Sequence, residues 1–163
     1  MQPYARAIEI PFDYGVSQID ERPSLDHAPS VLVADDDPSV LAMIANYCAR
    51  MGFDVDTASD GLQAFLKVRR GKPDILVIDV NMPELDGLSV CAHLLDADRA
   101  PAKVIMITGS KNANTLQRCE RVAAYHARKG PNFWTDLEAA LTQIDPRLAR
   151  RNRQRRARRA DSR

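Results

Sequence analysis

The chain has 163 residues, of which 45% are hydrophobic and 28% charged, which predicts one packed domain of ordinary size rather than two. The three cysteines form neither a Cys-x-x-Cys pair nor an even disulfide set, no apolar run reaches the roughly 18 residues of a membrane span, and the chain start lacks the pattern of a secretory signal; we therefore expect a cytoplasmic protein without a membrane span. The net charge of +1 conceals a segregation, because residues 147–163 hold nine Arg and one Asp and the remainder is acidic.

These patterns divide the chain into three parts. Residues 1–29 are rich in Pro, Asp, Gln and Ser, and the prolines interrupt any periodic pattern, so we expect a mostly irregular extension. Residues 30–146 alternate between apolar runs and amphipathic stretches, which predicts a folded domain. Residues 147–163 form an Arg-rich tail.

The first elements are the clearest. Residues 31–34 form a short apolar run that predicts a buried strand, and in the acidic stretch that follows Asp37 and Pro38 suit the N-cap and first residue of a helix. This helix is predicted to end at Gly52. Its expected inner face consists of Leu41, Ile44, Ala45 and Cys48.

The middle of the domain continues this alternation. Residues 53–58 alternate like a half-exposed strand, and residues 61–70 suit a helix. Residues 75–80 give the strongest strand pattern, apolar on both faces as in central parallel strands, with Asp79 near the end. The inner face of the helix at 61–70 is predicted to carry Leu62, Phe65 and Val68.

The last elements follow the same order. The patterns predict a helix at about 87–96, a strand at 104–107 that leads into Thr108, a helix at 111–122 and a weak strand at 123–128. The final helix is predicted to begin at Thr135, where residues 135–138 form a capping box. Its core-facing residues are expected to be Trp134, Leu137, Leu141 and Ile144.

Five strand–helix units in alternation predict an α/β domain. Such units form a doubly wound parallel sheet with right-handed crossovers and helices on both faces. We expect five strands in the flavodoxin-like order 2-1-3-4-5, in which the first and third strands are neighbours.

Polar residues gather where these strands end, which is where doubly wound sheets bind their ligands. With the first and third strands adjacent, Asp35, Asp36 and Asp79 converge within a few ångströms, and carboxylates so close repel one another unless a cation joins them. An all-oxygen set of this kind favours Mg²⁺. Asp37 is assigned to the helix cap, whereas Asp35 and Asp36 are more acids than a cap needs.

This set of residues predicts phosphoryl chemistry. The cation and Lys129 would neutralise an incoming phosphoryl group, Asp79 would attack phosphorus, and Thr108 would offer a hydroxyl to a phosphoryl oxygen. The expected product is an aspartyl phosphate.

The ordered segments LVADDD, DILVIDVNMPELDG and VIMITGS, followed by a lysine after the fifth strand, resemble the receiver domain of two-component response regulators over about residues 30–145. The resemblance implies Asp79 as the phosphoacceptor, Asp35 and Asp36 as the Mg²⁺-binding acids, and a contribution from Asn81 through its backbone carbonyl. Thr108 and Lys129 would then coordinate the phosphoryl group.

The resemblance also implies partners. A histidine kinase or phosphotransfer protein would supply the phosphoryl group, and the chain would be no enzyme beyond its own phosphorylation and dephosphorylation. Output would occur through phosphorylation-dependent protein–protein binding, including a homodimer through the helix at 111–122, the strand at 123–128 and the last helix.

The fifth strand departs from the family pattern of an aromatic residue, two further residues, Lys and Pro. Here the sequence is YHARKGP, with a glycine between Lys129 and the proline. Matching Lys129 to the family lysine puts His126 at the aromatic switch position. Sliding the match by one residue puts Tyr125 there and Arg128 at the lysine position.

The tail at 147–163 supports a second hypothesis, a nucleic-acid-binding protein in which the Arg-rich segment is the effector and the folded domain a scaffold. The tail could also bind anionic lipid, dock on the acidic body of another copy, or simply be a solvated end. Seventeen residues cannot form the output domain that many receivers carry, so we expect a stand-alone response regulator.

Two other classes fit less well. A phosphatase of similar fold would want a second acid two residues after its nucleophile, where this chain has Asn81. A dinucleotide enzyme would want a glycine-rich first turn, whereas the first turn here is acidic.

Overall fold

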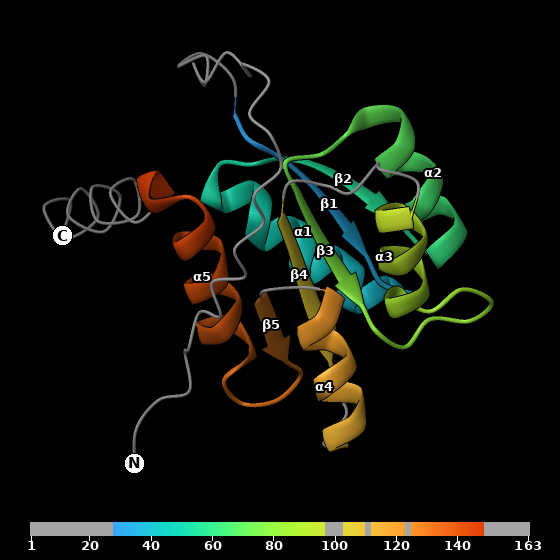
Figure 1. Ribbon diagram of the computed structural model, residues 1–163. Coiled ribbons are helices and arrows are strands. Elements are labelled where there is room, and N and C mark those ends of the chain that lie inside the picture. Colours follow the sequence, from blue (N-terminus) through green and yellow to red (C-terminus); the bar gives the residue numbers. More distant parts are fainter. Residues whose placement is uncertain (1–27, 97–102, 110–111, 123–124, 149–163) are drawn as a thin grey trace, which may run out of the picture.

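The computed structural model describes residues 28–96, 103–109, 112–122 and 125–148, so most of the extension at 1–29 and of the tail at 147–163 lies outside the described residues. Strands and helices alternate throughout this part of the chain (Figure 1). In chain order the elements are β1 (Ser30–Ala34), α1 (Pro38–Met51), β2 (Asp54–Ala58), α2 (Gly61–Gly71), β3 (Ile75–Asp79), α3 (Gly87–Asp96), β4 (Lys103–Thr108), α4 (Ala113–Val122), β5 (Tyr125–Arg128) and α5 (Phe133–Ile144).

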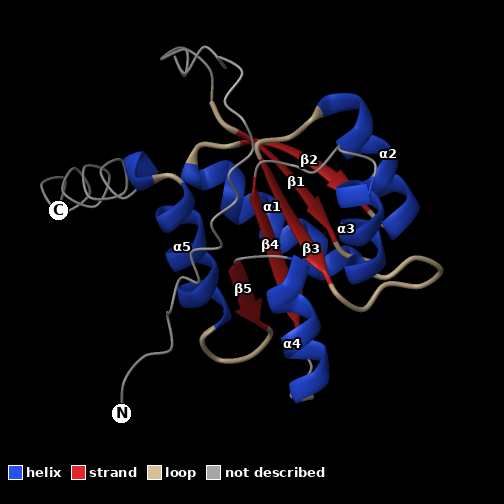
Figure 2. Ribbon diagram, viewed as in Figure 1, coloured by secondary structure: helices blue, strands red, loops and turns tan. Residues whose placement is uncertain are grey.

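The five strands form one parallel sheet in the order β2-β1-β3-β4-β5, with helices on both faces (Figure 2). This confirms the predicted fold class and strand order. Residues of α1 and α5 pack on one face, and residues of α2, α3 and α4 on the other.

Successive residues of the central strands face opposite sides of the sheet, as the pleat requires. Val31 and Val33 of β1 belong to the core beneath α1 and α5, whereas Leu32 and Ala34 belong to the core beneath α2, α3 and α4. All five residues of β3 are buried. The ends of β1 and β3 are therefore held on both faces, which makes them a fixed frame for the side chains that follow.

Helix α1 has the predicted ends. Asp37 is the N-cap, and its carboxylate accepts hydrogen bonds from the backbone N–H groups of Ser39 and Val40. Gly52 ends the helix with φ of 98°, a left-handed conformation that only glycine adopts without strain. The sequence signals for this helix were sufficient because they are local.

Helix α5 does not begin as predicted. It starts at Phe133 with Asn132 as N-cap and no side-chain capping hydrogen bond, so the prediction of a capping box at Thr135 is wrong. Phe133 is buried, and its N–H donates to the carbonyl of Gly130 over 3.1 Å. Burial of this aromatic ring extends the helix two residues upstream of the local capping signal.

Two predicted core residues lie at the surface. Trp134 is 38% exposed and lies beside the ring of Tyr47, with the ring centroids 5.0 Å apart. Leu62 is 53% exposed, whereas Gly61, Ala64 and Val68 are buried. The small residues face the core because α2 approaches its neighbours closely: a Cβ atom on Gly61 would collide with the carbonyl oxygen of Leu85.

Among the helices in the described ranges, none combines the length and the apolar character that crossing a membrane requires.

Candidate functional site

Three acids meet at the carboxyl edge of the sheet. β1 and β3 are hydrogen-bonded neighbours, so Asp35, directly after β1, lies beside Asp79, the last residue of β3. Each of Asp35, Asp36 and Asp79 offers a carboxylate oxygen within 4.8 Å of the others. Asp35 and Asp79 are buried and Asp36 is exposed. The site therefore has two buried acids and one at its rim.

Lys129 is the counter-charge of the two buried acids. Its Nζ lies 3.0 Å from Oδ2 of Asp35 and 3.1 Å from Oδ2 of Asp79. The backbone N–H of Lys129 donates to the carbonyl of Thr108, which fixes the start of the β5–α5 loop beside the end of β4. With Asp36 included, the three carboxylates exceed this one ammonium in charge, so the site keeps a capacity for a further cation.

The Asp79 carboxylate is incompletely satisfied. Its Oδ1 is buried and accepts no hydrogen bond from the residues that the structure describes. Burial raises the pKa of Asp79 above its usual range; the charge of Lys129 opposes this rise and the charge of Asp35 adds to it. A buried oxygen without a partner is costly. This oxygen and the neighbouring acids fit a hard divalent cation such as Mg²⁺, which takes oxygen ligands.

The lysine stays protonated in this setting. Burial acts to lower the pKa of Lys129, but its hydrogen bonds to Asp35 and Asp79 and the charges of both outweigh that effect, so the pKa is raised. Lys129 therefore remains a fixed positive charge at neutral pH, within contact distance of the predicted acceptor.

Thr108 ends β4 at the same edge. Ile107 is paired with Asp79 in the sheet, so Thr108 lies one residue further towards the carboxyl edge, and it is 1% exposed. The structure thus brings five of the predicted site residues to this edge: Asp35, Asp36, Asp79, Thr108 and Lys129. The sixth, Asn81, has an exposed side chain in the loop after β3, and a hydrogen bond from its backbone to the Asp79 carboxylate acts to lower the pKa of Asp79.

The fifth strand resolves the register that the sequence left open. Lys129, and not Arg128, contacts the buried acids, whereas Arg128 is exposed. Tyr125 packs against the core beneath α1 and α5. By strand alternation, the exposed His126 points to the opposite face, the side of its sheet partner Met106 and of Thr108.

The residues that hold the site together were not recognised in the sequence. The N–H of Gly87 donates to the carbonyl of Val80, and a Cβ atom on Gly87 would collide with the carbonyl oxygen of Asp79. Oδ1 of Asp86 accepts a hydrogen bond from the N–H of Ser89 over 2.7 Å at the start of α3. The start of α3 itself was predicted at about residue 87 and is confirmed, and the pattern Asp-Gly-x-Ser at 86–89 is a capping signal for it.

A hollow of about 370 Å³ opens beside the lysine. It is formed mainly by the β5–α5 loop, which contains the glycine inserted relative to the family pattern. Its lining residues are Arg128, Lys129, Gly130, Pro131, Asn132 and Asp136. A small anionic donor has room to approach Lys129 from this side.

Two curated proteins are similar to this chain in sequence. The response regulator MprA of Mycobacterium leprae is 44% identical over 119 residues, which cover 72% of this chain and 48% of that protein. The alkaline phosphatase synthesis transcriptional regulatory protein PhoP of Bacillus subtilis is 45% identical over 64 residues, 39% of this chain and 27% of PhoP. The chain thus matches less than half the length of these two relatives.

Two solved structures of signalling proteins have a fold similar to that of this chain. The chemotaxis protein CheY4 of Vibrio cholerae superposes with a TM-score of 0.63 at 27% identity, covering 72% of this chain and 98% of CheY4. The response regulator TrrA of Thermotoga maritima, in complex with Mg²⁺ and BeF, has a TM-score of 0.63 at 25% identity and covers 71% of this chain and 98% of TrrA. Residues 31–128 match the response regulator receiver domain, and because this match covers more than half of the chain, the chain belongs to that family.

Proposed function

We propose that the chain is a response regulator that accepts a phosphoryl group on Asp79 from a histidine kinase or phosphotransfer protein in the cytoplasm. The observation that carries the proposal is the contact of Lys129 with Asp35 and Asp79 beside a third acid, Asp36. This arrangement supplies a nucleophilic carboxylate, an ammonium group that can pair with phosphoryl oxygens, and a cluster of three acids that can bind a divalent cation.

The proposed metal ligands are carboxylates of Asp35, Asp36 and Asp79, with the backbone carbonyl of Asn81 added on family grounds. When bound, Mg²⁺ would neutralise charge on the phosphoryl oxygens. Asp36 is exposed at the rim, so this side of the acidic cluster is open to solvent. The buried Asp35 also accepts the N–H of Asp37 over 2.9 Å, which orients its carboxylate.

In the proposed transfer, a carboxylate oxygen of Asp79 forms a bond to phosphorus while the phosphorus–nitrogen bond of the donor phosphohistidine breaks. The bonding electron pair returns to the imidazole nitrogen, and the product is a mixed anhydride on Asp79. Lys129 would pair with the phosphoryl oxygens, and the Thr108 hydroxyl would donate to one of them. The chain acts only on itself in this step.

The phosphorylated chain would pass on the signal by binding a partner protein. Movement of Thr108 and Lys129 towards the phosphoryl group would bias α4, β5 and α5, because Lys129 joins the end of β5 to the site. A partner protein, or a second copy of the chain, would recognise that surface. His126, exposed on the Thr108 side of β5, is the proposed switch residue.

The test is transfer from histidine kinases of the same organism, each first labelled with ATP carrying a radioactive γ-phosphate. We expect label to move from one kinase onto the chain in the presence of Mg²⁺, and not onto an Asp79→Asn variant. Label on the variant would place the acceptor elsewhere, and failure of every kinase together with failure of small phosphodonors would reject the proposal.

A further inference from the structure

The helices of this fold end where the next strand begins, so their last residues collect at the amino edge of the sheet, opposite the acceptor site. In Figure 1 the strands start at the upper side of the molecule and their arrowheads point to the lower side. The residues at this upper edge include several exposed basic side chains. They are Arg50 at the end of α1, Arg69, Arg70 and Lys72 at the end of α2, and Lys103 at the start of β4, whereas Arg147 after α5 is exposed but paired with Asp145.

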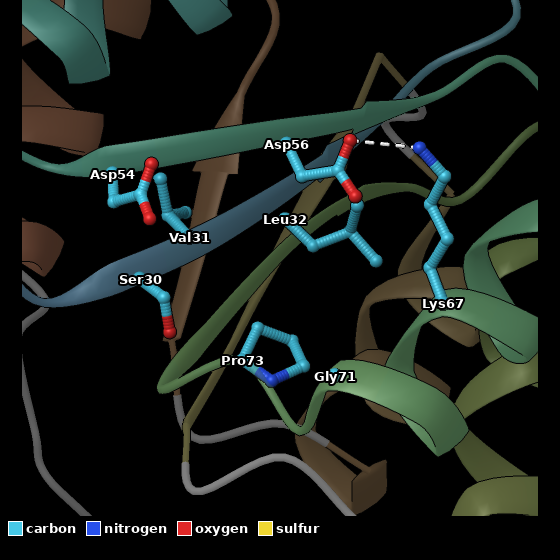
Figure 3. A pocket seen from close by; sticks show the side chains of 8 residues that line it. All are labelled: Ser30, Val31, Leu32, Asp54, Asp56, Lys67, Gly71 and Pro73. Carbon is cyan, nitrogen blue, oxygen red and sulfur yellow. Dashed lines mark hydrogen bonds and ion pairs between the residues drawn. The ribbon is translucent and has the colours of Figure 1, made fainter.

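The acids of the amino edge are fewer and mostly engaged. Asp74 accepts hydrogen bonds from the N–H and hydroxyl of Ser30, and Asp145 is paired with Arg147 at 2.8 Å. A hollow of about 120 Å³ lies between the start of β1, β2 and the end of α2, with Asp54 and Asp56 at its wall (Figure 3). Lys67 pairs with Asp56 over 2.7 Å, so the acidic part of this edge is centred on Asp54.

The opposite, carboxyl edge has the other sign of charge. Beyond the acceptor site it carries Asp37, Asp60, Glu84 and Asp86. Five-residue strands separate the two edges by about 16 Å at the usual rise per residue. A polyanion approaching the folded domain is therefore repelled from the phosphoacceptor edge and attracted to the amino edge.

The Arg-rich tail leaves the domain at the basic edge. Leu148 is 1% exposed and belongs to the core beneath α1 and α5, so it fixes the point of departure. Residues 149–163 then hold eight Arg and one Asp. Fifteen residues can reach at most about 50 Å, enough to extend the positive charge of the edge along a rod-shaped ligand.

The composition of the tail selects among polyanions. Residues 149–163 contain no aromatic residue, so they offer no platform for stacking on single-stranded bases. Their apolar residues are three alanines, too little apolar surface for a helix that inserts into a membrane interface. Arginine without aromatic or aliphatic partners suits the regularly spaced phosphates of a duplex.

We infer that the amino edge of the folded domain binds the phosphate backbone of duplex nucleic acid without reading its sequence, and that the arginines of residues 149–163 add to the affinity. This goes beyond phosphoryl acceptance and does not require it. Because the two faces lie at opposite edges, a chain bound to a duplex still presents Asp79 to a phosphodonor.

The experiment measures fluorescence anisotropy of a labelled 30-base-pair duplex with the full-length chain, without phosphodonor, over a series of salt concentrations. Replacing all eight tail arginines by Gln should weaken binding at least about 100-fold at low salt. Arg70→Gln with Lys72→Gln should weaken it about three- to tenfold and lower the slope of log affinity against log salt by about one or two. The matched control, Arg118→Gln with Arg128→Gln, changes the charge equally on α4 and β5 and should stay within about twofold.

Substitutions that add positive charge provide a second test, because a variant that fails to fold would not bind the duplex more tightly. Asp54→Lys, at the acidic part of the basic edge, should tighten duplex binding, whereas Glu84→Lys at the carboxyl edge should have less effect. Equal effects of the two double variants would overturn the role of the folded edge. Binding to vesicles of phosphatidylserine and phosphatidylcholine, with no binding to the duplex at the same salt, would overturn the choice of ligand. Since no phosphodonor is present, either failure is separate from failure of the acceptor chemistry.

Discussion

At the scale of single residues, the proposed acceptor chemistry depends on the burial of the Asp79 carboxylate among charged groups. Asp79 is 3% exposed, has one oxygen against Lys129 and another without a hydrogen-bond partner among the described residues. Burial therefore raises the pKa of this carboxyl above its ordinary value, although the charge of Lys129 opposes the rise. The oxygen without such a hydrogen-bond partner is available to a cation or a phosphoryl group.

The raised pKa of Asp79 predicts a specific pH dependence. Stability from a group with a raised folded pKa is fully present below its unfolded value, near 3.8, and is lost as pH rises through the folded value. Without divalent cations, the free energy of unfolding of the native chain, relative to that of Asp79→Asn, should fall between pH 4 and neutrality. Urea unfolding across this range checks it, and a difference independent of pH would contradict the burial argument.

The choice between the two basic residues of the fifth strand gives a second prediction. Lys129→Ala should abolish most of the change in hydrogen exchange that Mg²⁺ and beryllium fluoride produce in α4 and β5, because Lys129, unlike Arg128, contacts Asp79. Arg128→Ala, at an exposed neighbouring position, should leave most of that change. Equal effects of the two substitutions would reject this assignment of the lysine.

The three acids and Lys129 were predicted from sequence, but the match of the fifth strand to the family pattern was left open between two registers. Asp35 and Asp79 directly end strong apolar runs, and parallel neighbours must bring such ends together. Lys129 follows a short strand of mixed character, and the extra Gly130 removes the local spacing that would have fixed the match. Only the packed structure, with Tyr125 in the core, decides which basic side chain turns to the acids.

At the scale of elements, the site depends on how closely α3 approaches the end of β3. Gly87 has no side chain at the point where its Cβ would meet the Asp79 carbonyl. Gly87→Ala should therefore destabilise the domain by about 1–3 kcal/mol, the usual cost of overpacking, and weaken phosphorylation with it. Urea unfolding measures the loss.

Gly71 provides the matched control for that prediction. It is the last residue of α2, and a Cβ added there would have no atom within 4 Å. Gly71→Ala should be neutral or stabilise the domain by up to about 1 kcal/mol, because alanine has fewer unfolded conformations to lose. If both alanine variants lost equal stability, close approach of α3 to the strand end would not be the cause.

Element types and strand order followed from sequence, whereas some element ends and faces did not. The cap of α1 at Asp37 is a local hydrogen-bonding pattern and was confirmed. The predicted start of α5 was wrong because burial of Phe133, a tertiary effect, outweighs the capping box at Thr135. The prediction that Leu62 faces the core was wrong because α2 lies close to Leu85, and Gly61 rather than a large residue takes the position against that loop.

At the scale of the whole molecule, cation binding should be visible as stability. A ligand that binds only the folded state at ten times its dissociation constant stabilises by about 1.4 kcal/mol. Mg²⁺ should stabilise the native chain in this way, and Asp36→Asn should reduce the effect because it removes an exposed carboxylate of the cluster. The control, Asp54→Asn, removes an exposed acid at the opposite edge and should keep the full Mg²⁺ effect in thermal unfolding. Equal losses in both variants would show that the cation is not held at the acidic cluster.

Phosphoryl transfer to Asp79 is tested by the intact mass of the chain after incubation with Mg²⁺ and a small phosphodonor such as acetyl phosphate. We expect a mass increase of one phosphoryl group, which is lost when Mg²⁺ is withheld and lost in Asp79→Ala. An increase that persists in the variant would place the acceptor on another residue. No increase, under conditions where Mg²⁺ stabilises the chain, would contradict self-catalysed phosphorylation at this site.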